Sequence, residues 1–309
     1  MLILRASSWM RNNLFSTWII IELSVILLLG LITLDTSYSR SESIIKYFII
    51  QIMTSLLLLI CVALTVFRKT LLTTIWLIFM ICVKMGVFPF QIWLVKIVGK
   101  MNWVTYLMIR RVRKIIPITI CFYRLSYLSI MIISTSSVVG GSLMGINNTI
   151  IQKIIVYSSM IHVGWCFCSL IFREWAFYAY LLSYLFMITW LSVFCNKKSI
   201  FHINQISLFG FNNQKIILML MCLNIAGFPP FIGFIIKWMV INMIVIANIK
   251  IIIAVMVISS SVATFFYLQI WFMLMIKHVV NNKWWSCAYN RPMIASLIMI
   301  SHLLLFVVN

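Results

Sequence analysis

Residues 215–246 read KIILMLMCLNIAGFPPFIGFIIKWMVINMIVI, an apolar run that Gly227, Pro229 and Pro230 interrupt. The run is longer than the roughly 20 residues with which a helix crosses a bilayer. Proline removes an amide donor and clashes with the preceding turn, so a helix through this stretch is broken. At membrane depth, protein or water must satisfy the freed backbone groups, and in transporters such breaks line cavities. The stretch therefore predicts a broken membrane helix beside a polar cavity.

A second apolar run, 71–95, is interrupted in the same manner. Gly86 and Pro89 break this run, and Lys84 comes just before the break. In the first run, Lys237 follows the prolines by about two helical turns. A kink that serves packing alone is the alternative interpretation of each break. Two breaks that both lie beside a lysine favour a functional cavity.

The composition of the 309-residue chain excludes a soluble globular protein. Hydrophobic residues make up 64% and charged residues 9%, against about 25% charged residues in soluble domains. The expected fold class is all-α, a polytopic transmembrane helical bundle of about ten helices in one domain, 1–309. We expect a short N-terminal stub at 1–13 and the longest loop at 196–214. The predicted spans are 14–33, 44–67, 71–95, 103–123, 126–146, 150–172, 175–195, 215–246, 249–277 and 292–308.

The charge balance limits the choice of partners. There are 24 Lys and Arg against 4 Asp and Glu, a formal net charge of +20. Because the basic residues are scattered singly among apolar runs, nucleic acid is excluded as a partner. Anionic lipids such as cardiolipin, or acidic neighbouring subunits, are better counter-charges. No glycine-rich phosphate loop, Cys-x-x-Cys pair or nucleophile motif occurs, so we expect no catalytic, cofactor-binding or metal-binding residues.

Glu22 lies in the middle of the first apolar run, and Lys84 lies inside the third. A charge at the centre of a membrane helix costs about 2.5 to 3.5 kcal/mol on insertion scales. Glu22 must therefore face a cation, carry a proton or belong to a proton path. A buried lysine can accept and release protons, and an approaching carboxylate changes that balance. For Lys84 and Lys237, snorkelling of the ammonium group to the membrane surface is the alternative.

The fourth run carries four cations close together: Arg110, Arg111, Arg113 and Lys114. Such a cluster predicts a hydrated cavity, an acidic partner or lipid phosphates beside this helix. Displacement of the helix toward one membrane surface is the alternative.

His162 lies inside the sixth run, on a helix that also carries Tyr157, Ser158 and Ser159. A histidine among hydroxyl groups can relay protons. A hydrogen-bonded histidine with a structural role is the equal alternative.

Four sequence motifs carry a family resemblance. They are Lys46-Tyr47-Phe48 with Gln51, KMGVFPFQIW at 84–93, Gly145-Ile146-Asn147 through Lys153-Ile154 with Tyr157-Ser158-Ser159 and His162-Val163-Gly164-Trp165, and GFPPFIGF at 227–234 ending in Lys237-Trp238. In this order and spacing they resemble the antiporter-like subunits of respiratory complex I, the proton-pumping NADH:ubiquinone oxidoreductase of mitochondria. The first and last motifs favour the subunit 2 family.

The resemblance implies an antiporter-like helical fold that is shortened at its N-terminus and encoded in a mitochondrial genome. It also implies a multi-pass protein of the mitochondrial inner membrane, with other membrane-arm subunits and accessory subunits as partners. No cofactor is expected in this chain, because NADH, FMN, iron-sulfur clusters and ubiquinone belong to other subunits of such a complex.

The resemblance also suggests roles for individual residues. Glu22 matches an acidic residue that couples to a lysine, and Lys84, Lys114 and Lys237 match the lysines of a proton path. His162 is a further candidate on that path. The implied function is proton translocation coupled to electron transfer from NADH to ubiquinone.

Departures from the family pattern keep two alternatives open. Gln91 stands where the family usually has His, Val95-Lys96 where it has Pro-Glu, and arginines surround Lys114. One alternative is a structural membrane-arm subunit without its own proton channel. The other is a stand-alone cation/proton antiporter.

Overall fold

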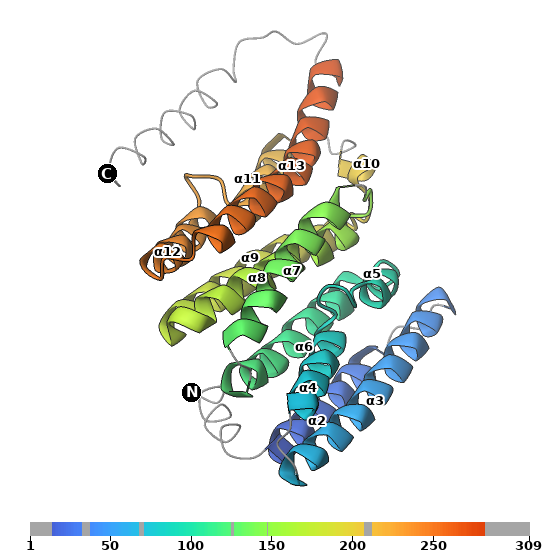
Figure 1. Ribbon diagram of the computed structural model, residues 1–309. Coiled ribbons are helices and arrows are strands. Elements are labelled where there is room, and N and C mark those ends of the chain that lie inside the picture. Colours follow the sequence, from blue (N-terminus) through green and yellow to red (C-terminus); the bar gives the residue numbers. More distant parts are fainter. Residues whose placement is uncertain are drawn as a thin grey trace. The chain divides into compact units, whose positions relative to one another are not determined.

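Helices form nearly all of the residues that the computed structural model describes, which are 14–32, 38–67, 71–124, 127–146, 148–206 and 212–281. Within these ranges there is one isolated antiparallel bridge, between Ile150 and His202, and no strand. The helices are α2 (Leu14–Ile32), α3 (Tyr38–Phe67), α4 (Leu71–Met85), α5 (Ile92–Val98), α6 (Trp103–Arg124), α7 (Tyr127–Gly145), α8 (Ile151–Phe172), α9 (Glu174–Lys197), α10 (Ile203–Ile206), α11 (Asn212–Ala226), α12 (Ile232–Ile246) and α13 (Lys250–Asn281) (Figure 1).

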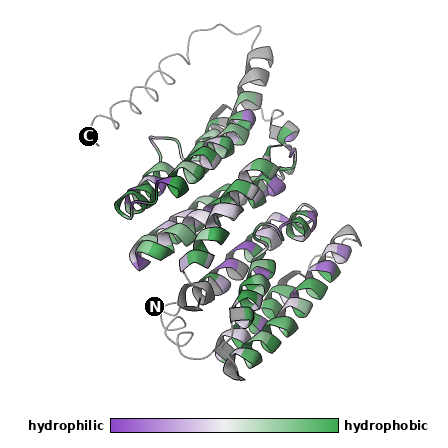
Figure 2. Ribbon diagram, in the orientation of Figure 1, coloured by the Kyte–Doolittle hydropathy of each residue, from purple (hydrophilic) through white to green (hydrophobic). Residues whose placement is uncertain are grey.

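The predicted fold class, an all-α transmembrane bundle, is confirmed. In the part of the chain that the structure describes, five helices are long and apolar enough to cross a membrane, namely α3, α7, α8, α9 and α13. Shorter apolar helices fall within α2, α4, α11 and α12. Figure 2 shows mostly hydrophobic residues along these helices, with hydrophilic ones interspersed. Helix α10 lies inside the segment 196–214 that we expected to be the longest loop, whereas the stub 1–13 and the span 292–308 lie outside the described residues.

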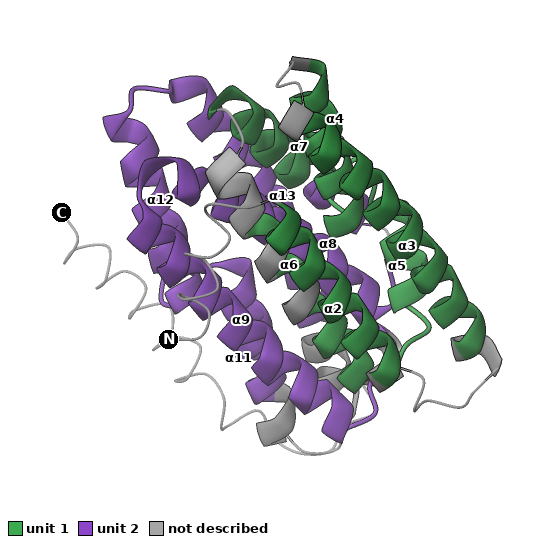
Figure 3. Cartoon of the chain, turned by 90° about the horizontal axis from the view of Figure 1, so that it is seen from below, with its two compact units in different colours: residues 1–140 green, residues 141–309 purple. Residues whose placement is uncertain are grey.

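The chain divides into two compact units, Met1–Gly140 and Gly141–Asn309, with the boundary inside α7 (Figure 3). The single domain 1–309 stays a prediction.

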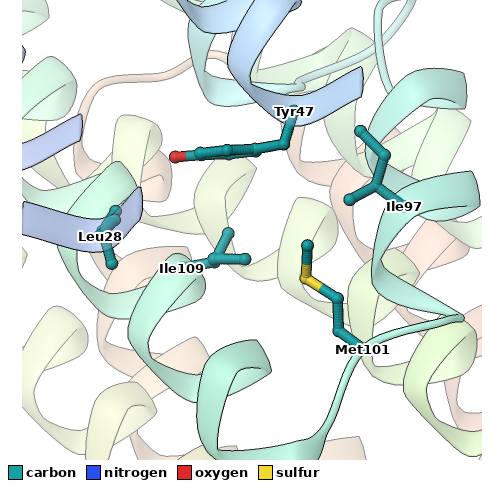
Figure 4. Packing of buried hydrophobic residues seen from close by; sticks show 5 residues of the cluster. All are labelled: Leu28, Tyr47, Ile97, Met101 and Ile109. Carbon is teal, nitrogen blue, oxygen red and sulfur yellow. The ribbon is translucent and has the colours of Figure 1, made fainter. Parts of the chain in front are cut away.

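In the first unit, α3 packs against α2, α4 and α5, and α6 packs against α2 and α4. A buried cluster joins four of these helices: Leu28 from α2, Tyr47 from α3, Ile97 from α5, Ile109 from α6, and Met101 from the turn before α6 (Figure 4). None of these side chains is more than 4% exposed. Because lipid tails are as apolar as these side chains, van der Waals packing holds the helices together.

In the second unit, α8 is the central helix. Of its apolar window, 89% is buried, against 39% for α9 and 28% for α13. Helix α8 contacts α9, α12 and α13, and α11 contacts α9, α12 and α13. A helix that is apolar all round is expected to be surrounded by other helices. Most polar side chains of α8, His162 among them, are buried in protein, whereas Lys153 and Tyr157 are partly exposed.

Candidate functional site

At the first helix break, α4 ends in a tight turn at Gly86. The amide of Val87 donates to the carbonyl of Cys82 at 3.1 Å, and that of Gly86 donates to Val83, also at 3.1 Å. This pair of bonds is the Schellman motif, which needs a left-handed residue at its centre. Gly86 provides it, with φ of +63°. Lys84 therefore lies in the last turn of a half-helix, and the chain resumes as α5 after a cis Phe88–Pro89 bond.

Glu22 on α2 and Lys84 on α4 form an ion pair. Lys84 Nζ lies 3.9 Å from Glu22 Oε1, and the two side chains are 1% and 22% exposed. Neither of these atoms has a hydrogen-bond partner among the described residues. Attraction between two charges is strong where little water screens it. Adding a proton to the carboxylate, or removing one from the lysine, therefore changes the local electrostatic energy substantially.

Lys114 on α6 is also buried, with 7% of its surface exposed. It lies three residues before Pro117, which is inside the helix and cannot donate to the carbonyl four residues earlier. One turn before Lys114, Arg110 is 3% exposed and donates a hydrogen bond to the hydroxyl of Tyr106. The Arg110 guanidinium also lies 5.1 Å from the centre of the Tyr106 ring, a cation–π contact.

The cations of α6 were predicted to border a cavity or to lie at a membrane surface. Arg110 and Lys114 are buried, on a helix that packs against α2 and α4. The side chains of Arg111 and Arg113 lie outside the described residues. Two of the four cations are therefore buried, and the helix that carries them contacts the helices of Glu22 and Lys84.

The second broken helix repeats the turn of the first. The amide of Phe228 donates to the carbonyl of Leu223 at 3.3 Å, and that of Gly227 to Asn224 at 3.2 Å. Gly227 has φ of +83°, so this turn is a second Schellman motif. The side chain of Asn224 then accepts a hydrogen bond from the amide of Gly233 at 3.0 Å, at the start of α12. The predicted breaks at Pro89 and at Pro229-Pro230 thus share one turn geometry.

Lys237 on α12 reaches back to this turn. Its Nζ donates a hydrogen bond of 2.7 Å to the carbonyl oxygen of Ala226, the last residue of α11. The side chain is 7% exposed. A Cβ on Gly227 would lie 2.9 Å from Lys237 Nζ. Glycine at position 227 therefore permits both the left-handed turn and the close approach of the ammonium group.

His162 on α8 has a tyrosine pair from α9 beside it. Its Nδ1 is 2.8 Å from the hydroxyl of Tyr180. Its ring lies 4.5 Å from that of Tyr184, centre to centre. His162 and Tyr180 are each 2% exposed and Tyr184 is 5% exposed. A hydroxyl hydrogen-bonded to an imidazole can both orient the ring and exchange a proton with it.

The structure brings some predicted site residues together and not others. Glu22 and Lys84 form a pair, and Lys114 lies in the same unit, on a helix that contacts both α2 and α4. His162 and Lys237 lie in the second unit, on helices α8 and α12, which contact each other. The roles of these residues in proton transfer stay predictions.

Sequence reasoning did not identify the partners of these residues. Tyr106 precedes Arg110 by four residues, and this spacing on one helix face was a signal available from the sequence. Tyr180 lies 18 residues from His162, on the next helix, and Ala226 contributes a backbone carbonyl. No sequence pattern marks those two. Among the described residues, no group of three His, Cys, Asp or Glu side chains could hold a metal ion.

Known proteins resemble this chain along most of its length. Residues 63–266 match the family described as NADH:quinone oxidoreductase/Mrp antiporter, TM. A curated relative, the NADH-ubiquinone oxidoreductase chain 2 of Locusta migratoria, is 27% identical over 299 residues, which are 92% of this chain and 86% of the relative. The protein of the same name from Anopheles gambiae is 28% identical over 312 residues, 94% of this chain and 92% of the relative. These relatives confirm the resemblance that the four motifs indicate.

Solved structures share the fold. A chain of respiratory complex I from Thermus thermophilus superposes with a TM-score of 0.72 at 19% identity, over 83% of this chain and 64% of that one. A chain of the Mrp complex from Dietzia sp. DQ12-45-1b gives a TM-score of 0.71 at 18% identity, over 84% of this chain and 56% of that one. This chain thus spans less than two thirds of either.

Proposed function

This chain belongs to the NADH:quinone oxidoreductase/Mrp antiporter family of transmembrane proteins, and we propose that it is a proton-translocating membrane-arm subunit of respiratory complex I. It works beside other antiporter-like and small membrane subunits, accessory subunits and anionic lipids of the mitochondrial inner membrane. The curated relatives are named chain 2 of NADH-ubiquinone oxidoreductase, and they match the chain nearly from end to end. This similarity supports the assignment to the same position in the complex.

The observation that carries the proton-translocating role is the ion pair of the buried Lys84 with the partly buried Glu22. Two oppositely charged groups 3.9 Å apart lie at the end of a half-helix. Charged groups inside membrane segments are costly and mark ion or proton pathways. A purely structural pair is expected to make direct hydrogen bonds that offset the cost of burying its charges, and these two atoms make none among the described residues.

The proposed mechanism moves one proton through these groups in turn. A proton that reaches the Glu22 carboxylate neutralises it and weakens its attraction for the Lys84 ammonium. Lys84 then releases its proton through water toward Lys114. From there the proton passes to Lys237, with His162 and Tyr180 as a second relay in that unit. Glu22 then passes its proton to the neutral Lys84, and this transfer restores both the carboxylate and the ammonium group.

We propose that electrons do not enter this chain. NADH, FMN, the iron-sulfur clusters and ubiquinone are bound by other subunits of the complex. This chain contributes the helices and the buried titratable groups, and the redox reaction elsewhere drives their protonation cycle.

Membership in the complex is tested on native membranes. Membranes are extracted in mild detergent, separated on a native gel and stained for NADH dehydrogenase activity, and the active band is analysed by mass spectrometry. We expect this chain in an active band of very high mass. Migration as a small inactive species alone would contradict the assignment, and the antiporter alternative would replace it.

The pumping role is tested with Lys84→Ala in the assembled complex. We expect NADH oxidation and assembly to be retained and the proton-to-electron ratio to fall. Lys96→Ala is the matched control, because Lys96 lies on the adjoining half-helix α5 and is exposed. An unchanged proton-to-electron ratio in the assembled Lys84→Ala complex would contradict the pumping role.

The structural subunit without a channel is the second candidate function. It is favoured by Arg110, whose buried charge one turn from Lys114 is held by Tyr106. A fixed cation there disfavours a second positive charge on Lys114. A normal proton-to-electron ratio in both Lys84→Ala and Lys114→Ala complexes would select this candidate.

A further inference from the structure

We propose that Gln51 on α3 holds ordered water against the Glu22–Lys84 pair and so acts as a positioning residue for that pair. The water site itself rests only on the arrangement of these three side chains. The effect of Gln51 on proton transfer rests in addition on the proposed pumping function.

The inference starts from the burial of Gln51. Its side chain is 0% exposed. Neither its amide nitrogen nor its amide oxygen has a hydrogen-bond partner among the described residues. Buried polar side chains are nearly always hydrogen-bonded, to protein or to ordered water. An amide that has two donors and an acceptor inside a membrane protein therefore points to bound water.

Gln51 lies at the level of Glu22. Trp18 on α2 donates a hydrogen bond of 3.0 Å to the carbonyl of Ser55 on α3. Further along, Leu28 and Tyr47 from these helices meet in one buried cluster, so α2 and α3 run antiparallel (Figure 4). Glu22 follows Trp18 by four residues, and Gln51 precedes Ser55 by four. Glu22 and Gln51 therefore each lie one helical turn from the contact between Trp18 and Ser55, displaced in the same direction. Each also lies on the same face of its helix as the residue that makes this contact.

Lys84 lies close to the same level. Helix α4 starts at Leu71, four residues after α3 ends at Phe67, and the two helices pack against each other. This hairpin is antiparallel. Lys84 comes 13 residues after Leu71, where α4 begins, and Gln51 comes 16 residues before Phe67, where α3 ends, so the two lie within about one helical turn of each other along the hairpin.

The three side chains thus supply complementary groups at about the same level of α2, α3 and α4. Lys84 provides an ammonium donor, Glu22 a carboxylate acceptor, and Gln51 both donors and an acceptor. The separation of 3.9 Å between Lys84 Nζ and Glu22 Oε1 is longer than a hydrogen bond. Polar atoms at such separations are commonly connected through water. Water held by Gln51 would give the pair hydrogen bonds in both of its charge states.

The water site is tested directly by a high-resolution map of the whole complex. We expect density for ordered water within about 3.2 Å of the Gln51 amide and of the Glu22 carboxylate. The same map of a Gln51→Met complex should lose this density. A Gln51 amide that bonds directly to protein or lipid, with no water, would overturn the site whatever the chain pumps.

The positioning role is tested by comparing Gln51→Met with Thr54→Val in the assembled complex. Thr54 is a matched control because it is buried on the same helix and its hydroxyl already donates to the carbonyl of Gln51 at 2.9 Å. In the methionine variant we expect unchanged NADH oxidation and assembly, with partial loss of the pumping that Lys84→Ala removes. Equal proton-to-electron ratios in the two variants would overturn the positioning role. A failed Lys84→Ala test would instead overturn the pumping function and leave the water site standing.

Discussion

Lys237 donates its hydrogen bond to the carbonyl oxygen of Ala226 from eleven residues further along the chain, across the break between α11 and α12. The carbonyls at the C-terminal end of a helix lack intrahelical donors and carry partial negative charge. A lysine ammonium can therefore donate a hydrogen bond to a carbonyl there. Lys84 has a comparable position, in the last turn of α4. Each break thus has a buried lysine close to the C-terminal end of a half-helix, and in the second break the ammonium group bonds to a carbonyl of that end.

Lys237 can stabilise the turn through its hydrogen bond to Ala226, and it can release a proton. Substitutions distinguish these two roles. Lys237→Arg keeps a cation that can bond to Ala226, but arginine does not release its proton at any pH the complex tolerates. We expect this variant to assemble and oxidise NADH with a reduced proton-to-electron ratio. Lys237→Met should also lose thermal stability, because the buried carbonyl of Ala226 loses its donor at a cost of about 1 to 3 kcal/mol. A normal ratio in the arginine variant would show that the charge of Lys237 serves structure alone.

Gly227→Ala should also disturb the hydrogen bond between Lys237 and Ala226, because it changes the turn beside that bond. A left-handed backbone costs a non-glycine residue about 1 to 2 kcal/mol, and the added methyl carbon would lie 2.9 Å from Lys237 Nζ. The lysine must then move and lengthen its bond to Ala226. We expect a lower thermal stability of the complex and a lower proton-to-electron ratio.

Gly30→Ala is the control for this glycine substitution. Gly30 lies inside α2, and a Cβ there would meet no atom within 4 Å. Alanine is the better helix former by about 1 kcal/mol, so this variant should be as stable as the parent or slightly more stable. Equal losses of stability in both variants would contradict the role assigned to the turn at Gly227.

The course of the helices was predictable because bilayer thickness and hydrogen bonding constrain membrane chains so strongly. The run 103–123 became α6 (Trp103–Arg124), and the run 150–172 became α8 (Ile151–Phe172). The breaks were predictable too, since Gly86 and Gly227 adopt backbone angles that few other residues tolerate. The shared Schellman geometry was not predicted, because it depends on which carbonyls the turn amides reach.

The site was predictable in its charged members and not in their partners. Glu22 and Lys84 stand out because a charge in an apolar run is rare, and the spacing of family motifs connected them. Tyr180 is one of many aromatic residues in an apolar helix, and only packing of α8 on α9 brings its hydroxyl to His162. Gln51 belongs to one of the motifs, but the burial of its side chain depends on how other helices pack against α3.

Tyr180→Phe tests whether this hydroxyl matters to His162. The variant keeps the ring and removes the bond to Nδ1, which should lower stability by about 1 kcal/mol. If the pair relays protons, the proton-to-electron ratio falls as well. Ser183→Ala is the control, because Ser183 lies on the same helix and its hydroxyl bonds only locally, to the carbonyl of Tyr180 at 2.8 Å. A normal proton-to-electron ratio together with a lower stability would show that the bond between Tyr180 and His162 has a structural role alone.

Glu22→Gln is the most direct test of the buried ion pair, because it removes the charge and keeps the shape. Lys84, 1% exposed, would then be a buried cation without its carboxylate. Breaking a buried pair in this way costs about 3 to 5 kcal/mol when the remaining charge persists. Lys84 can escape that cost by releasing its proton, so we expect an assembled complex in which Lys84 stays neutral and the proton-to-electron ratio falls.

Glu42→Gln is the matched control for Glu22→Gln. Glu42 pairs with Lys46 and, at 3.0 Å, with Lys100, but its side chain is 47% exposed. Exposed ion pairs are screened by water and salt and contribute little. We therefore expect the Glu42 variant to pump normally at any ionic strength. If instead the two glutamine variants lowered the ratio equally, burial would not be what distinguishes Glu22, and the argument that connects its burial to proton transfer would fail.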